Sequence, residues 1–319
     1  MKKIISVITA LSITAALCIS LSGCGEKKTN YKVGICQLVQ HDALDAATKG
    51  FKDALTEKLG DKVTFDEQNA AGEPATCTTI VNQFVSSKVD LIFANATGAL
   101  QAAVSATDSI PIVGTSITDY ATALEMSDWN GKTGINVTGT SDLAPLEDQA
   151  KMIKELIPNV KTVGILYCSG EANSKYQATE VAKYLKEMGI ESREFTSADS
   201  NDLAQVVTSA CAAVDAIYIP TDNTMASSTE IINNIAEPAK VPIIAGEEGI
   251  CKGCGIATLS IDYYSLGKKA GEMAYDILVN GKDPADMEIG FASDLTKKYV
   301  KTRCEALGIT VPSDYEEIQ

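Results

Sequence analysis

The stretch YKVGICQLVQHDALDAATKGFKDALTEKL, residues 31–59, is the part of the sequence that decides the fold. It opens with an apolar run that predicts a strand over Tyr31–Leu38. Apolar side chains from Leu44 to Leu55 then recur at helical spacing and predict a helix over Asp42–Leu59. A strand followed by a helix of this length is the repeating unit of a parallel sheet that helices cover.

The same alternation continues along the chain. Further strands are expected at Lys62–Asp66, Val89–Ala94, Ile110–Gly114, Thr133–Thr138, Thr162–Tyr167, Glu191–Phe195, Ala216–Ile219, Val241–Ile244, Ile256–Ser260 and Met287–Phe291. Further helices are expected at Glu73–Ser87, Thr97–Thr107, Asp142–Ile157, Asn173–Met188, Asp202–Ala213, Asp222–Glu237, Tyr263–Leu278 and Lys298–Ala306. About ten strands exceed one comfortable open sheet. We therefore predict an α/β protein of two doubly wound parallel-sheet lobes, with a ligand cleft at the carboxyl ends of the strands.

The composition and the missing motifs narrow the function classes. Hydrophobic residues make up 45% of the 319 residues, which is ample for a core. The net charge of −15 repels phosphate backbones and argues against nucleic-acid binding. A single histidine excludes sites built from several histidines. We find no GxGxxG after the first strand, no GxxxxGK(S/T), no GxSxG and no HExxH, so we expect no enzyme, no cofactor and no metal.

The N-terminus has the pattern of an export signal. Two lysines precede an apolar run from Ile4 to Leu21. The run ends in Leu21-Ser-Gly-Cys24, which resembles the bacterial lipobox, where the cysteine receives a lipid and the chain is cut just before it. We predict a lipoprotein signal peptide over residues 1–23, lipidation of Cys24 and a polar tether over residues 24–30. The alternative is an ordinary secreted protein in which the cysteine falls at this position by chance.

Seven cysteines remain beyond residue 24, and an odd number argues against a complete disulfide framework. Cys251-Lys-Gly-Cys254 is a lone CxxC in a stretch that we interpret as a glycine-rich loop. A zinc site would need a second pair or histidines at a suitable spacing. Free thiols, a local disulfide and a catalytic or metal-binding pair stay open, with free thiols favoured.

Polar residues follow most of the predicted strands. Such residues often cap the helices that come next, and a ligand role is the competing interpretation. His41 is the sharpest case, because it is either a solvated residue at a helix start or a side chain that points into the cleft. Several of these clusters would converge on one cleft, which favours a ligand site.

At these residues the chain resembles a known family. The segments that carry the resemblance are Val33-Gly-Ile-Cys-Gln-Leu-Val-Gln-His41, Ser169-Gly-Glu-Ala-Asn-Ser174, Tyr218-Ile-Pro-Thr-Asp-Asn-Thr224 and Ile261-Asp-Tyr-Tyr264. Together they are similar to the ABC-transporter substrate-binding lipoproteins of the type I periplasmic-binding class, in the tryptophan/tyrosine branch often called TrpX-like. The resemblance runs from about residue 31 to 305. Gln40 and Glu247 depart from the residues usual in that branch, and the first departure puts the exact ligand in doubt.

The resemblance implies three crossings between the lobes, near Val137–Thr138, Ser260–Ile261 and residues 288–290. Lobe one would be residues 31–137 plus 261–288, and lobe two residues 138–260 plus 289–319. It also implies closure of the lobes around a small molecule and delivery to an ABC permease with its ATPase. We expect an exported monomer, lipid-anchored to the outer face of the cytoplasmic membrane. Sugar import and a sensory role without transport are the alternatives.

The resemblance implies an aromatic amino acid as the ligand. Its carboxylate, its ammonium and its side chain each need a different partner in the cleft. The ligand carboxylate suits hydroxyls and N–H groups at helix starts, and the ammonium suits Asp222 first, with Glu247 or Asp262 as alternatives. The side chain would lie near Leu38 and His41. The full set of candidate ligand-binding residues is Leu38, His41, Thr97, Gly98, Ser116, Glu171, Asn173, Ser174, Asp222, Asn223, Glu247 and Asp262.

Overall fold

A computed structural model describes residues 28–292 and 295–319 of the chain. The predicted signal peptide, Cys24 and most of the tether lie outside the described residues. The chain divides into Met1–Asn30 and a compact unit, Tyr31–Gln319, which contains both sheets. Within the described residues, no helix combines the length and the apolar character that a membrane crossing requires.

The first lobe is built on a parallel sheet with the strand order β11-β5-β4-β3-β1-β2. Its strands are β1 (Tyr31–Gln37), β2 (Val63–Asn69), β3 (Leu91–Asn95), β4 (Ile112–Ile117), β5 (Val137–Ser141) and β11 (Gly290–Phe291). Its helices are α2 (Asp42–Leu59), α3 (Pro74–Ser86), α4 (Thr97–Ala106), α5 (Tyr120–Ala123) and α12 (Tyr263–Asn280). Short 3-10 turns at Gly60–Lys62 and Pro284–Asp286 complete it.

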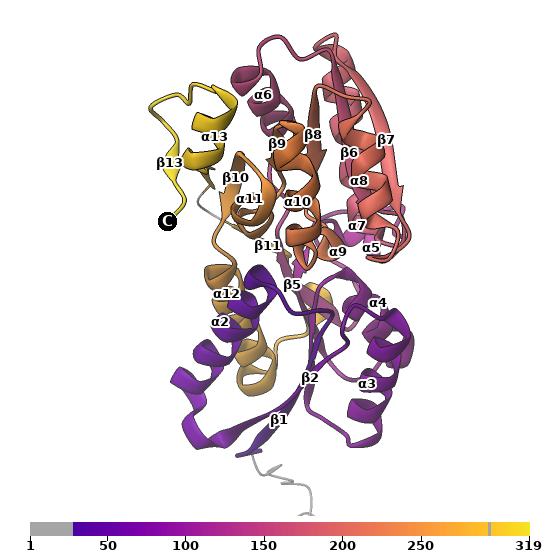
Figure 1. The fold of residues 1–319 in the computed structure, drawn as a ribbon. Helices are drawn as coiled ribbons and strands as arrows, with labels where there is room; N and C mark the ends of the chain where they lie inside the picture. The colour runs from indigo at the N-terminus through magenta and orange to yellow at the C-terminus, as the bar shows by residue number, and fades with distance from the viewer. Residues whose placement is uncertain (1–27, 293–294) are drawn as a thin grey trace, which may run out of the picture. The chain divides into compact units, whose positions relative to one another are not determined.

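The second lobe has the strand order β13-β12-β10-β9-β8-β6-β7. Its strands are β6 (Thr162–Cys168), β7 (Glu191–Ser197), β8 (Ala216–Ile219), β9 (Ile243–Ala245), β10 (Ala257–Ile261), β12 (Leu295–Tyr299) and β13 (Glu316–Glu317). Its helices are α6 (Leu146–Leu156), α7 (Ala172–Glu187), α8 (Leu203–Cys211), α9 (Asn223–Ala226), α10 (Thr229–Ala239), α11 (Glu248–Cys254) and α13 (Lys301–Leu307). The expected architecture of two α/β lobes is confirmed (Figure 1).

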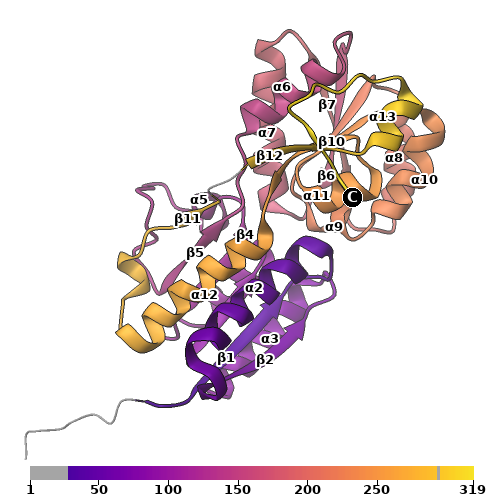
Figure 2. The same ribbon diagram turned by 90° about the vertical axis from the view of Figure 1, so that its left-hand side faces the viewer.

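Helices α2 and α12 lie side by side although they are far apart in the sequence (Figures 1 and 2). Glycines on both helices permit this close approach. A Cβ atom on Gly50 would lie 2.1 Å from the carbonyl oxygen of Tyr264, and one on Gly267 would lie 2.0 Å from that of Ala47. Because α12 follows the second crossing, this contact joins the returning chain firmly to the start of the first lobe.

Two of the expected crossings are placed too early in the chain. The first was expected near Val137–Thr138, but strand β5 continues to Ser141 and pairs with β4 of the first sheet. The third was expected near residues 288–290, but β11 still pairs with β5. The first lobe therefore keeps both strands. The second crossing follows β10, which ends at Ile261 in the second sheet.

Several predicted elements are wrong in detail. The helix expected over Asp222–Glu237 is broken into α9 and α10, which Ser227–Ser228 separate. The helix expected over Lys298–Ala306 begins only at Lys301. The residues before it form β12, which runs antiparallel to β10 and pairs Leu295 with Ile261. The strand expected over Met287–Phe291 is reduced to its last two residues, because a 3-10 turn ends just before it.

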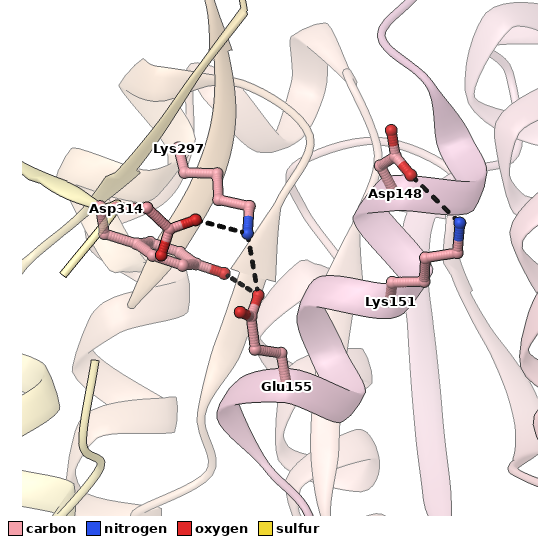
Figure 3. Close-up of polar contacts among 6 residues, drawn as sticks. Asp148, Lys151, Glu155, Lys297 and Asp314 are labelled. Atoms are coloured by element: carbon pink, nitrogen blue, oxygen red, sulfur yellow. Dashed lines mark hydrogen bonds and ion pairs between the residues drawn. The ribbon is translucent and has the colours of Figure 1, made fainter. Parts of the chain in front are cut away.

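The end of the chain is tied to the second lobe by a small polar cluster (Figure 3). The ammonium of Lys297 lies 3.2 Å from the Glu155 carboxylate on α6 and 2.9 Å from Asp314. The hydroxyl of Tyr315 donates a hydrogen bond of 2.7 Å to the same glutamate. This cluster joins β12 and the C-terminal segment to α6, and so connects segments that follow the first and third crossings.

Candidate functional site

A cavity of about 710 Å³ lies between the lobes. The first lobe contributes an apolar patch of Leu38, Val39 and Pro74 to its wall. The second lobe contributes polar groups to the facing wall. The principal ones are Glu171, Asn173, Asn223, Thr224, Ser227 and Ser228. Among the described residues, no aromatic side chain lines this cavity.

The first lobe has two strained residues at the carboxyl ends of its central strands. Ala96 has a φ of 86° just before α4, and Ser116 has a φ of 54° where β4 is bulged. Both angles are unfavourable for residues other than glycine, and such strain concentrates at functional sites. No side chain caps α4, and the Ser116 hydroxyl is buried without a hydrogen-bond partner. The start of α4, where Gly98 lines the cavity, therefore presents N–H donors to it, whereas the buried Ser116 hydroxyl lies outside the lining.

The loop from β1 to α2 is held by a buried amide network. Gln37 donates to the Val39 carbonyl at 2.9 Å and accepts from the Thr48 hydroxyl at 2.6 Å. Asn95, at the end of β3, donates to Thr48 at 2.9 Å. The neighbouring strand end thus fixes the loop that carries Leu38 and His41.

Glu171 is the centre of the polar wall on the second lobe. One of its carboxylate oxygens accepts from the Thr224 amide at 2.8 Å and from the Thr224 hydroxyl at 2.9 Å. The other accepts from the backbone N–H of Asn223 at 3.0 Å and from its side-chain amide at 2.7 Å. A half-buried carboxylate with so many donors is held at one place on the cavity wall.

Asp222 caps the short helix α9 instead of facing the cavity. Its carboxylate is 1% exposed and accepts from the backbone N–H groups of Cys168 at 2.7 Å and Met225 at 2.8 Å. Burial, and then the nearby Glu171 carboxylate, raise the pKa of Asp222 above its usual range. Asp222, the first choice for a ligand ammonium, is buried and does not line the larger cavity, whereas Glu171 does.

The two alternatives for that role also cap helices. Glu247 accepts from the Gly249 amide at 2.6 Å and from the Ile250 amide at the start of α11, and burial raises its pKa to about 7. Asp262 is exposed and accepts from the Ser265 amide at 3.0 Å at the start of α12. Both residues line a second cavity of about 390 Å³, which lies beside the second crossing.

The structure divides the predicted site residues into three sets. Those that line the larger cavity are Leu38, Gly98, Glu171, Asn173 and Asn223. Those that line neither cavity are His41, Thr97, Ser116, Ser174 and Asp222, and Glu247 and Asp262 line the smaller one. Sequence reasoning missed Pro74, the first residue of α3, and Gln101, in the second turn of α4, and neither residue carries a motif that marks it.

The seven cysteines beyond residue 24 are free thiols in the structure, as favoured from the sequence. Cys251 and Cys254 are buried in helix α11, not in the expected loop. The reason lies far away in the sequence: the Arg303 guanidinium donates to the carbonyls of Cys251 at 3.2 Å and Gly253 at 2.6 Å, and so satisfies the end of this helix. Among the described residues, no group of three potential ligands is arranged to hold a metal.

Two α/β lobes with the polar ends of their parallel strands around one interlobe cavity define a ligand-binding protein with the type I periplasmic-binding fold. The chain belongs to the ABC transporter substrate binding protein family, which matches residues 32–316. Proteins of this family bind small molecules outside the cytoplasm and work with ABC transporters, and the class is non-enzymatic.

Three relatives extend this assignment. A tyrosine-binding protein of Clostridioides difficile is 38% identical over 305 residues, which cover 90% of this chain and 87% of the relative. A Streptococcus pneumoniae ABC domain in complex with L-Trp is 36% identical, with a TM-score of 0.85, and the match covers 89% of this chain and 96% of that one. The ligand-free, open structure of a Clostridium difficile substrate-binding protein with adhesive properties is 37% identical, with a TM-score of 0.69 and coverage of 91% and 99%.

Proposed function

We propose that this protein captures an aromatic amino acid between its lobes and delivers it to an ABC importer. Relatives of 38% and 36% identity are described as a tyrosine-binding protein and as a complex with L-Trp. The single observation that carries the proposal is the opposite chemistry of the two cavity walls. The first lobe contributes the apolar patch of Leu38, Val39 and Pro74, and the second contributes a fixed carboxylate, Glu171. An aromatic amino acid carries an apolar side chain and an ammonium that match these two walls.

The geometry favours Glu171 over Asp222 as the partner of the ligand ammonium. Glu171 lines the cavity and is half-buried, whereas the Asp222 carboxylate is turned into its own lobe. The ligand carboxylate would be held by the N–H groups of Thr97 and Gly98 together with the Ser116 hydroxyl. Asn173, which donates to the Thr221 carbonyl at 3.0 Å, would complete the polar wall on closure.

The ligand side chain would lie against Leu38, Val39 and Pro74. Burying roughly 150–250 Å² of an aromatic side chain contributes about 4–6 kcal/mol before entropic costs. Sugar-binding sites usually stack an aromatic ring on the sugar, and the described lining of this cavity holds none. The wall chemistry therefore favours an amino acid over a sugar.

Titration calorimetry tests the proposal directly. We expect the soluble Cys24→Ser form to bind tryptophan, tyrosine or phenylalanine with micromolar or better affinity, which corresponds to about 8 kcal/mol. Glucose, ribose and aliphatic amino acids are titrated separately as alternative ligands. Binding of a sugar with no response to any aromatic amino acid would overturn the ligand class. A protein that binds none of them would favour a sensory role.

We also propose that the mature protein is a monomer, anchored by lipid on Cys24 to the outer face of the cytoplasmic membrane. Leu21-Ser-Gly-Cys24 supports the anchor, because it falls directly at the end of the apolar run. Cys24→Ser should move the protein from the membrane to the soluble fraction and remove the acyl mass from the N-terminal peptide. Unchanged membrane retention without an acyl mass would contradict the anchor.

A further inference from the structure

One hydrogen bond crosses between the lobes beside the larger cavity. The Nε2 atom of His41, at the start of α2, lies 3.2 Å from the Oδ1 atom of Asn223, at the start of α9. The two residues belong to different lobes and are 182 positions apart in the sequence. Any separation of the lobes at this point must break this bond.

The direction of this bond is fixed by a third residue. The side-chain amide of Asn223 donates to the Glu171 carboxylate at 2.7 Å, and a carboxylate can only accept. The Oδ1 atom of Asn223 therefore faces His41 as an acceptor, and the imidazole must donate through Nε2. Glu171 also accepts from the backbone N–H of Asn223 at 3.0 Å, so the acceptor is held in place before His41 reaches it.

His41 stands between the two interlobe cavities. Leu38 and Val39, just before it, line the larger cavity, whereas Asp42 and Ala43, just after it, line the smaller one. Neither lining includes His41. The side chain is thus placed to join the lobes without touching a ligand in either cavity. The arrangement of this structure also resembles the L-Trp complex, with a TM-score of 0.85, more closely than the open relative, with 0.69, at nearly equal identity.

We propose that His41, Asn223 and Glu171 form an interlobe latch, in which His41 is a positioning residue that holds the closed form without contacting the ligand. The proposal rests on the proposed function, since it concerns how long a captured amino acid stays bound. A contact that exists only after closure slows opening and leaves the encounter unchanged. Its loss should therefore raise the ligand dissociation rate and spare the association rate.

The surroundings of His41 supply an independent readout. The charged groups that face it are Asp42 and Asp45 on its own helix and Glu171 on the opposite lobe. Burial outweighs their attraction and lowers the pKa of His41 below its usual range. Because the open form leaves the imidazole nearer its ordinary pKa of about 6.5, acid favours opening. Affinity should fall below about pH 6.5 in the wild type, and this part of the pH profile should be absent from a glutamine variant.

Stopped-flow dissociation with tyrosine as ligand tests the latch. His41→Ala and Asn223→Ala should each raise the dissociation rate, His41→Ala by about five- to tenfold, consistent with the net worth of one hydrogen bond. The double variant should raise the dissociation rate by less than the product of the two single increases, because both substitutions remove the same bond. His41→Gln, which keeps a donor, should recover most of the loss. Thr56→Ala, an exposed position on the same helix that lines neither cavity, is the matched control and should behave like the wild type.

Small-angle scattering without ligand separates failure of the latch from failure of the proposed function. If the wild type binds no amino acid but His41→Ala is more open than the wild type, the latch stands and the proposed function fails. If the wild type binds and His41→Ala changes neither the scattering nor the dissociation rate, the latch is overturned. Fully additive effects of His41→Ala and Asn223→Ala would overturn it as well, as would direct contact between His41 and a bound amino acid in a crystal structure.

Discussion

The two lobes share one architecture but prepare their cavity walls in opposite ways. In the second lobe, the acidic residues at the strand ends are already satisfied: Glu171, Asp222 and Glu247 all accept backbone N–H groups of their own lobe. In the first lobe, the Ser116 hydroxyl has no partner and α4 has no side-chain cap. The first lobe thus has an unpartnered hydroxyl behind its cavity wall, whereas the wall of the second lobe holds fixed acceptors.

This difference supports the proposed orientation of a zwitterionic ligand. A carboxylate held by its neighbours needs no rearrangement to receive a cation. We therefore propose that the second lobe holds the ligand ammonium and that the first lobe holds the carboxylate at the start of α4. One small molecule would then contact both walls, and its binding would be coupled to closure of the lobes.

The largest expected effect is on the acceptor wall. Glu171→Ala removes the proposed ammonium partner together with the acceptor for Asn223 and Thr224. We expect the affinity for tyrosine to fall at least about 100-fold, which is about 2.7 kcal/mol. Titration calorimetry measures it, and circular dichroism verifies that the variant is folded. An affinity within threefold of the wild type would show that the second lobe does not hold the ammonium through this residue.

Asp222 is the matched comparison within the same wall. Asp222→Ala leaves the N–H groups of Cys168 and Met225 without their acceptor, so we expect a loss of about 2 kcal/mol in the free energy of unfolding. Asp222→Asn should keep ligand affinity within about tenfold. Urea denaturation and calorimetry separate the two quantities. A stable Asp222→Asn variant that no longer binds the ligand would show that Asp222 is the partner of the ligand ammonium.

Glu247 gives the second lobe a distinct dependence on pH. Its pKa is raised to about 7 by burial, so the folded state keeps a proton that the unfolded state releases near pH 4.5. This contribution to stability is complete below about pH 4.5 and is lost as the pH rises to about 7. One group changes the slope by at most about 1.4 kcal/mol per pH unit. Glu247→Gln should flatten the wild-type decline over this window in urea denaturation, and an unchanged slope would contradict the assignment.

The smallest effect on ligand affinity is expected at Ser116 in the first lobe. Ser116→Gly removes the unpartnered hydroxyl and relieves a φ of 54°. Ligand affinity should fall about five- to tenfold, whereas the free energy of unfolding should rise by up to about 1 kcal/mol. Ser116→Ala is the control, because it loses the hydroxyl but keeps the strain. If both variants bind as tightly as the wild type, the open donors of the first lobe serve no ligand.

Much of the fold could be predicted from the sequence, because its signals are local. The helix over Asp42–Leu59 has the predicted bounds, as does the strand over Ala216–Ile219. The candidate site was less predictable. Any polar residue after a strand can cap a helix or face a ligand. Glu171 and Asp222 each follow a strand of the second sheet and carry the same charge, so their positions in the sequence do not distinguish them. Which carboxylate faces the cavity depends on the donors that surround each one, and those donors come from neighbouring strand ends.

The sequence by itself determined the α/β class, the two lobes and the residue types available at the strand ends, because the hydrophobic period and the position of polar residues after a strand are properties of short segments. Only the tertiary structure decided where partners from distant segments meet. Arg303 donates hydrogen bonds to carbonyls at the end of the glycine-rich stretch that ends in Cys254. The segment cannot satisfy these carbonyls alone, so this distant side chain stabilises it as a helix. In the same way, Asn223 gives His41 a partner on the opposite lobe, which no local pattern could show.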